Sequence, residues 1–122
     1  MEGIDAPEMK QKCKKSYLQT KIFNFQKNYN CGLTSKKKLV QKIGNKPVKC
    51  ILLGKDRYKR YLAKCFKANT NLNRWMVRNG HAVAYRKYSK LYIPDENLAK
   101  EEKVGLWRGT FVKPEKWRRI MN

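Results

Sequence analysis

Residues 48–66 read VKCILLGKDRYKRYLAKCF, and this segment has the clearest secondary-structure pattern in the chain. Residues 47–53 alternate side chains with the two-residue period of a β-strand, and residues 61–66 return as a second apolar run. Between them, residues 54–58 (GKDRY) contain the glycine and aspartate that are typical of a hairpin turn. We therefore expect two antiparallel strands joined by this turn.

The segment before the hairpin is predicted to contain one helix. Thr34 or Ser35 can cap the N-terminus of a helix that runs to residue 43, because a side-chain hydroxyl accepts a hydrogen bond from a free backbone N–H group. Gly44 suits the C-terminal stop. Residues 9–31 are rich in lysine and show no clear apolar period, so we expect a long loop there.

The segment after the hairpin is predicted to contain two more helices. Asn71 can cap a short helix that ends at Gly80, and residues 82–85 then form a short strand or extended run. Asp95 precedes an acidic first turn, which suits the N-terminus of a helix that extends to about residue 104. The 122 residues are expected to form one domain, residues 1–122.

Charge is the outstanding property of the composition. Thirty Lys and Arg residues against nine Asp and Glu residues give a formal net charge of +21, which attracts polyanions. Nucleic acid is the first candidate partner; an anionic membrane surface and a basic protein that merely coats RNA are the alternatives. A hydrophobic fraction of 41% argues against global disorder, and no apolar run has the length of a membrane span. A single histidine and the lack of a CxxC pair exclude a histidine-based metal cluster and disfavour a zinc ribbon.

Four segments, in this order, together resemble one known family. They are residues 3–8 (GIDAPE), 54–63 (GKDRYKRYLA), 73–82 (NRWMVRNGHA) and 101–107 (EEKVGLW). In this order they are similar to the motifs of the thermonuclease, or staphylococcal-nuclease-like, family. The resemblance implies an α+β fold in which helices pack on an OB-like barrel, a fold that binds nucleic-acid strands in an electropositive groove.

The resemblance also implies catalytic and metal-binding roles. Glu8 matches the loop carboxylate taken as the general base, and Arg60 matches the hairpin arginine that clamps the scissile phosphate. Asp5 matches a calcium ligand, and Ala6 lies where the family offers a backbone carbonyl to the ion. Calcium is a hard cation that prefers such oxygen ligands, so Ca²⁺ is the expected cofactor.

Further residues are expected to contact DNA or RNA. Arg57, Tyr58, Tyr85 and Tyr88 fall where the family contacts phosphate or stacks on a base. The structural alternative for Arg57 and Arg60 is a solvated strand-edge charge, and for Tyr85 and Tyr88 it is amphipathic packing.

The sequence departs from the family pattern near its start. Only Met1 and Glu2 precede the GIDAPE segment, whereas family members carry further strands there, so the N-terminal strands are expected to be missing from this chain. Those strands supply another aspartate ligand and a second phosphate-clamping arginine. Two functions follow: a calcium-dependent endonuclease of DNA or RNA, or a catalytically inactive nucleic-acid-binding remnant of the same fold. Neither reading predicts a membrane or a protein partner.

The four cysteines bear on the cellular compartment. Cys13 and Cys31 flank the expected long loop, where a disulfide would help to order it. Cys50 and Cys65 lie at nearly symmetric distances from the hairpin turn and are either neighbouring buried thiols or a bridge. A disulfide would indicate an exported protein, secreted or periplasmic if an upstream signal peptide has been lost; otherwise the protein is expected to be cytoplasmic.

The charge predicts how binding depends on salt. Single-stranded DNA or RNA should bind at low ionic strength and dissociate steeply as salt rises, because neutralised phosphates release counterions. A fluorescence-anisotropy titration against salt measures the slope of log affinity. A flat slope, or no binding at low salt, would contradict the prediction.

Overall fold

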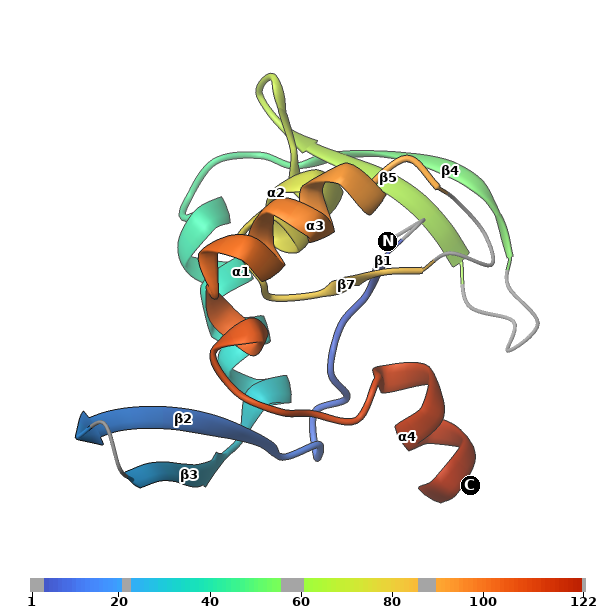
Figure 1. Cartoon of the computed structure of the whole chain (residues 1–122). Helices are drawn as coiled ribbons and strands as arrows, with labels where there is room; N and C mark the ends of the chain where they lie inside the picture. The colour runs from blue at the N-terminus through green and yellow to red at the C-terminus, as the bar shows by residue number, and fades with distance from the viewer. Residues whose placement is uncertain (1–3, 21–22, 56–60, 86–89, 122) are drawn as a thin grey trace.

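The computed structural model of the chain describes residues 4–20, 23–55, 61–85 and 90–121 (Figure 1). The strands are β1 (Ile4–Asp5), β2 (Cys13–Thr20), β3 (Phe23–Tyr29), β4 (Lys49–Lys55), β5 (Tyr61–Lys67), β6 (Thr70–Asn71) and β7 (Val83–Ala84). The helices are α1 (Cys31–Ile43), α2 (Leu72–Arg78), α3 (Ile93–Glu102), the 3₁₀ helix η1 (Gly105–Arg108) and α4 (Pro114–Met121). Helices and strands are thus mixed, as expected for an α+β chain.

The predicted hairpin is present as strands β4 and β5. They pair antiparallel, and the register places Cys50 opposite Cys65, which a disulfide joins. The sheet is extended by β6, which pairs with the end of β5. The pairing shifts between Leu52 and Gly54, and Gly54 has a φ of 139°, which a residue with a Cβ rarely adopts.

The other strands form two separate pairs. β1 pairs antiparallel with β7, and β2 pairs antiparallel with β3. Within the part of the chain that the structure describes, the three sheets share no strand, so their edges do not meet to close the expected OB-like barrel.

The prediction of a long loop over residues 9–31 was wrong. Strands β2 and β3 occupy most of this segment, and their register places Cys13 opposite Tyr29 at the base of the hairpin. A disulfide between Cys13 and Cys31 ties this base to the first residue of α1. The prediction relied on an apolar alternation of side chains, and lysines interrupt that alternation in this segment. The strands pair through their backbone groups, which do not require the alternation.

The helix ends follow the sequence in part. Gly44 terminates α1 and Asn71 caps α2 by accepting a hydrogen bond from the N–H of Arg74, both as predicted. By contrast, α1 begins three residues before Thr34, and Ser35 is not a cap, because its hydroxyl donates to the carbonyl of His81 at 2.8 Å. A tertiary hydrogen bond therefore replaced the local one.

The predicted start of α3 was also wrong. The helix begins at Ile93 rather than at Asp95, since Pro94 fits the first turn, where no N–H donor is needed. The Asp95 carboxylate accepts a hydrogen bond from Arg74 at 3.3 Å, and Arg78 donates two hydrogen bonds to Glu102. These ion pairs join α2 to α3.

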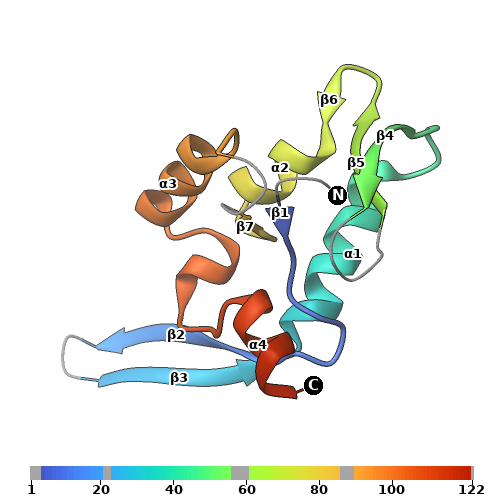
Figure 2. The same cartoon turned by 90° about the vertical axis from the view of Figure 1, so that its right-hand side faces the viewer.

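The largest core cluster surrounds the β1–β7 pair, which lies between α1 and α3 in Figure 2. Its buried members are Ile4, Met76, Val77, Ala82, Ala84 and Tyr92, with Leu39 of α1 and Ile93 of α3 packed against them. The cluster draws on elements from both halves of the chain, so it fixes β1 in place. None of the helices in the described ranges is long and apolar enough to cross a membrane.

Two glycines allow the turn after α2 to touch the start of η1. Gly80 has a φ of 73° and Gly105 a φ of 56°, and a Cβ on either one would overlap the backbone of the opposite segment. The Leu106 N–H donates to the Gly80 carbonyl at 2.8 Å across this contact. The absence of side chains at both positions is therefore a packing requirement.

We predict that Gly80→Ala destabilises the protein more than Gly44→Ala. At Gly44, where φ is 58° and ψ is −133°, an added Cβ would meet only the Gln41 carbonyl oxygen at 4.0 Å, so alanine there suffers only the conformational cost of about 1–3 kcal/mol. At Gly80 the overlap with the backbone of Val104 adds about 1–3 kcal/mol to a conformational cost of the same kind. Urea unfolding of both variants under oxidising conditions measures the difference. Equal losses would show that the close approach is not needed.

Candidate active site

The segment around Glu8 is a tight turn directly after β1, here named the Glu8 loop (residues 6–12). The N–H of Gln11 donates to the carbonyl of Glu8 at 2.8 Å, and the Gln11 side-chain oxygen accepts from the Glu8 N–H at 3.3 Å. Pro7 is buried within it. The loop is therefore closed on itself, and the backbone of Glu8 has a defined position.

The buried amide of Gln11 joins this loop to the C-terminal segment. Gln11 is fully buried, and its Nε2 donates to the carbonyl of Val112 at 2.6 Å. Beside it, the N–H of Lys14 donates to the carbonyl of Thr110 at 2.8 Å. A buried amide needs partners for both its oxygen and its nitrogen, and here one partner comes from each segment.

Helix α1 supports the loop from the other side. A Cβ on Gly32 would overlap the carbonyl of Glu8, so the first turn of α1 and the loop approach more closely than any other residue at this position would allow. The disulfide between Cys13 and Cys31 lies next to this contact in the chain and holds the end of the loop at the helix. The Glu8 loop thus lies between α1 and the C-terminal segment.

The Glu8 carboxylate is bound by an arginine that the sequence analysis missed. Arg118 of α4 donates from a terminal guanidinium nitrogen to Oε1 of Glu8 at 2.7 Å, across 110 positions of sequence. The Arg118 side chain is 9% exposed and that of Glu8 33% exposed, so the guanidinium is inside the protein while the carboxylate reaches solvent. Figures 1 and 2 both place α4 beside the segment that connects β1 to β2.

No single-sequence signal marked Arg118 as a site residue. Arg118 lies in α4, and the next residue, Arg119, is also an arginine. Only helical geometry distinguishes them, since one is buried and the other exposed.

The remaining predicted site residues are placed as follows. Asp5 pairs through its backbone with Val83, and Ala6 is half-buried at the start of the Glu8 loop. Tyr85 is buried, with 8% of its surface exposed, which corresponds to the packing alternative and not to an open stacking platform. Arg57, Tyr58, Arg60 and Tyr88 lie outside the described residues.

The described residues supply a limited set of metal ligands. No group of three His, Cys, Asp or Glu side chains that could hold a metal ion occurs among them. In the sequence Asp5 and Ala6 come shortly before Glu8, and an aspartate carboxylate and a backbone carbonyl are hard oxygen donors of the kind that calcium takes. These donors fit calcium in chemical type, but they are fewer than the six to eight oxygens that the ion usually binds.

Comparison with known proteins gives a match over most of the chain. Residues 1–109 match the family described as staphylococcal nuclease homologue. An uncharacterized endonuclease of Haemophilus influenzae is 36% identical over 97 residues, which are 77% of this chain and 54% of that protein. A probable staphylococcal-like nuclease, CAN3, of Oryza sativa subsp. japonica is 33% identical over 122 residues, which are 98% of this chain and 28% of that protein.

A relative that is named for a different role is similar to the same degree. The succinoglycan biosynthesis protein ExoI of Rhizobium meliloti is 32% identical over 111 residues, which are 88% of this chain and 54% of that protein. The chain therefore spans about half or less of the length of these curated relatives.

We predict that Arg118→Ala destabilises the protein while Arg119→Ala does not. Arg118 loses a charge-assisted hydrogen bond from a buried position, at a cost of about 1–3 kcal/mol because Glu8 can still be hydrated. Arg119 is the adjacent exposed arginine and provides the same change of charge. Thermal and urea unfolding measure both variants. Equal stability of the two variants would contradict the role assigned to the buried ion pair.

Proposed function

The chain belongs to the staphylococcal nuclease homologue family, and from this premise we propose that it hydrolyses phosphodiester bonds in DNA or RNA. Relatives carry names of nucleases, which supports nucleic-acid hydrolysis at the level of the family. The observation that carries the proposal for this chain is the Glu8 loop. It presents a partly exposed carboxylate on a backbone that is held from both sides.

The chemistry requires a group that accepts a proton from the attacking water. Glu8 is our candidate for this general base, because Oε1 is held by Arg118 and the side chain still reaches solvent. A fixed carboxylate loses little entropy when it orients a water molecule toward phosphorus.

Positive charge must also meet the phosphate oxygens. Arg60 is proposed as the clamp on the scissile phosphate, since a guanidinium can donate two parallel hydrogen bonds to it. The formal net charge of +21 draws the polyanionic substrate toward the protein at long range. Attraction alone does not cleave a strand, so Glu8 and Arg60 are the residues that the proposal depends on.

Calcium is the proposed cofactor, with the Asp5 carboxylate and the Ala6 carbonyl as its ligands from this chain. When bound, such an ion supplies positive charge that stabilises the negative charge building up on the phosphate. The likeness to the family also supports an OB-like barrel as the fold of which β1, β4, β5 and β7 form part. The two disulfides support an oxidising compartment outside the cytoplasm as the place of action.

The direct test is digestion of single-stranded and double-stranded DNA and of RNA with calcium or with a chelator. Glu8→Gln removes the proposed base and should lower the cleavage rate by at least about 100-fold, while nucleic acid still binds. Glu101→Gln is the matched control, because it makes the same chemical change at an exposed position of α3 and should cleave like the unmodified protein.

Three results would each contradict a part of the proposal. Normal cleavage by Glu8→Gln would remove Glu8 from the reaction. Binding of nucleic acid without cleavage, in the unmodified chain with calcium, would favour the catalytically inactive binding module instead. Cleavage that continues in the chelator would contradict calcium as the cofactor.

A further inference from the structure

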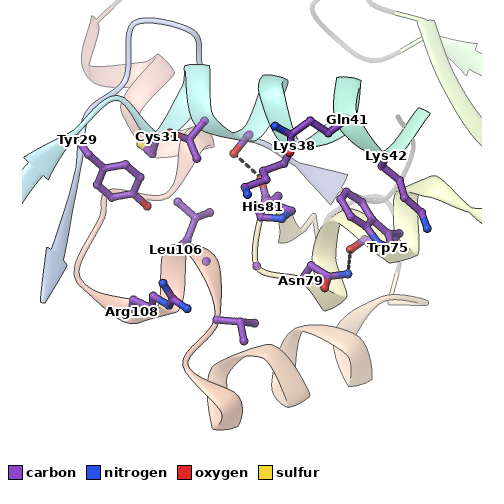
Figure 3. Close-up of a pocket in the computed structure, with 15 residues that line it drawn as sticks. Tyr29, Cys31, Lys38, Gln41, Lys42, Trp75, Asn79, His81, Leu106 and Arg108 are labelled. Atoms are coloured by element: carbon purple, nitrogen blue, oxygen red, sulfur yellow. Dashed lines mark hydrogen bonds between the residues drawn. The ribbon is translucent and has the colours of Figure 1, made fainter. Parts of the chain in front are cut away.

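A groove of about 750 Å³ lies beside α1, outside the Glu8 loop (Figure 3). One wall is the face of α1 that carries Lys38 and Lys42. The other wall is formed by the turn after α2 and by η1, which contributes Leu106 to the lining and Arg108 across the opening from α1. Its volume is in the range of small-molecule binding sites.

The charged side chains around this groove have one sign. Lys38 and Lys42 are one helical turn apart and share a face of α1, and Arg108 adds a third positive charge from η1. None of the described residues that line the groove is an aspartate or a glutamate. Burial, and secondly Lys38, lowers the pKa of His81; burial raises the pKa of Tyr29, and Arg108 acts in the opposite direction. A ligand with negative charge therefore suits this site.

Aromatic side chains stand at both ends. Figure 3 shows Tyr29 at one end and Trp75 at the other. The Trp75 ring lies 5.4 Å from that of His81, and Lys42 Nζ lies 5.6 Å from the centre of the same indole. Burial, with Lys38 as a second cause, lowers the pKa of His81 to about 4, so its imidazole is uncharged at neutral pH. The groove thus combines flat, uncharged rings with cations.

The combination selects one class of ligand. A simple inorganic anion would use the cations but not the rings, and an acidic peptide would use the rings only if it carried an aromatic residue beside its carboxylates. A nucleotide has both a negatively charged phosphate and a planar base, and base stacking on aromatic side chains is how single strands are commonly bound. We propose that this groove is a binding subsite for one nucleotide unit of a single-stranded nucleic acid, separate from the Glu8 carboxylate.

The groove and the Glu8 loop share the first turn of α1. Gly32 contacts the backbone of Glu8, while Cys31, Thr34 and Ser35 line the groove. A strand held in the groove is therefore kept on the element that supports the proposed base. The inference rests on the proposed function in that nucleic acid is the ligand, but it does not require cleavage.

The test follows the three tryptophan indole N–H signals by NMR while a short single-stranded oligodeoxythymidine is added in the presence of a chelator. Trp75 lines the groove, Trp107 packs against Phe111, and Trp117 lies on α4 beside the buried Arg118. The Trp75 signal should move with saturation, and the Trp107 signal should stay in place. Inorganic phosphate, added at the same concentrations, should leave the Trp75 signal unchanged.

Two double variants then separate the groove from general charge. Lys38→Gln with Arg108→Gln removes two charges from the groove, and Lys36→Gln with Lys37→Gln removes two exposed charges from the same helix. The groove pair should weaken oligonucleotide binding by about 5-fold or more and reduce the slope of log affinity against log salt by about 1. The control pair should change affinity by less than about 2-fold.

The inference is overturned if the oligonucleotide moves only the Trp117 signal, if both double variants lose affinity equally, or if phosphate reproduces the Trp75 shift at the same concentration. Failure of the proposed function has a different signature. In that case the chain does not cleave nucleic acid with calcium. The oligonucleotide still moves the Trp75 signal, and the double variant Lys38→Gln with Arg108→Gln still binds it more weakly than the unmodified protein.

Discussion

The site depends on a buried amide. Gln11 has no contact with water, and its amide is satisfied by the Glu8 backbone on one side and by the Val112 carbonyl on the other. Leaving either end of a buried amide without a partner costs free energy, so the loop after β1 and the segment before α4 are held together. The position of Arg118 next to Glu8 follows from this link, because α4 begins two residues after Val112.

The excess of positive charge places a second constraint on the molecule. A chain with a net charge of +21 repels itself when it is compact. Each carboxylate that pairs with an arginine reduces this repulsion locally. Glu8, Asp95 and Glu102 each pair with an arginine from another element. Two disulfides add links that do not depend on charge or salt. The formal excess of positive charge, to which the cations of the groove beside α1 contribute, attracts a polyanion.

Local elements were predictable where a local interaction determines them. The β4–β5 hairpin has its apolar alternation and turn residues, the Asn71 side chain caps the helix next to it, and Gly44 stops α1. The pair Cys13 and Cys31 was singled out from its position around residues 14–30, and the structure joins it. The β2–β3 hairpin was missed because lysines obscure its period. Ser35 and Asp95 were misassigned because tertiary partners took the side chains that were expected to cap helices.

The family, the strong positive charge and Glu8 as the candidate base could be predicted without coordinates, because they depend on residue identity and order along the chain. Three features are seen only in the folded chain: Arg118 and not Arg119 meets Glu8, Tyr85 is buried, and Lys38, Trp75 and Arg108 border one groove. They could not be predicted because they arise from contacts between residues far apart in the chain. Such contacts depend on how helices are packed and rotated, which no local pattern of residues records.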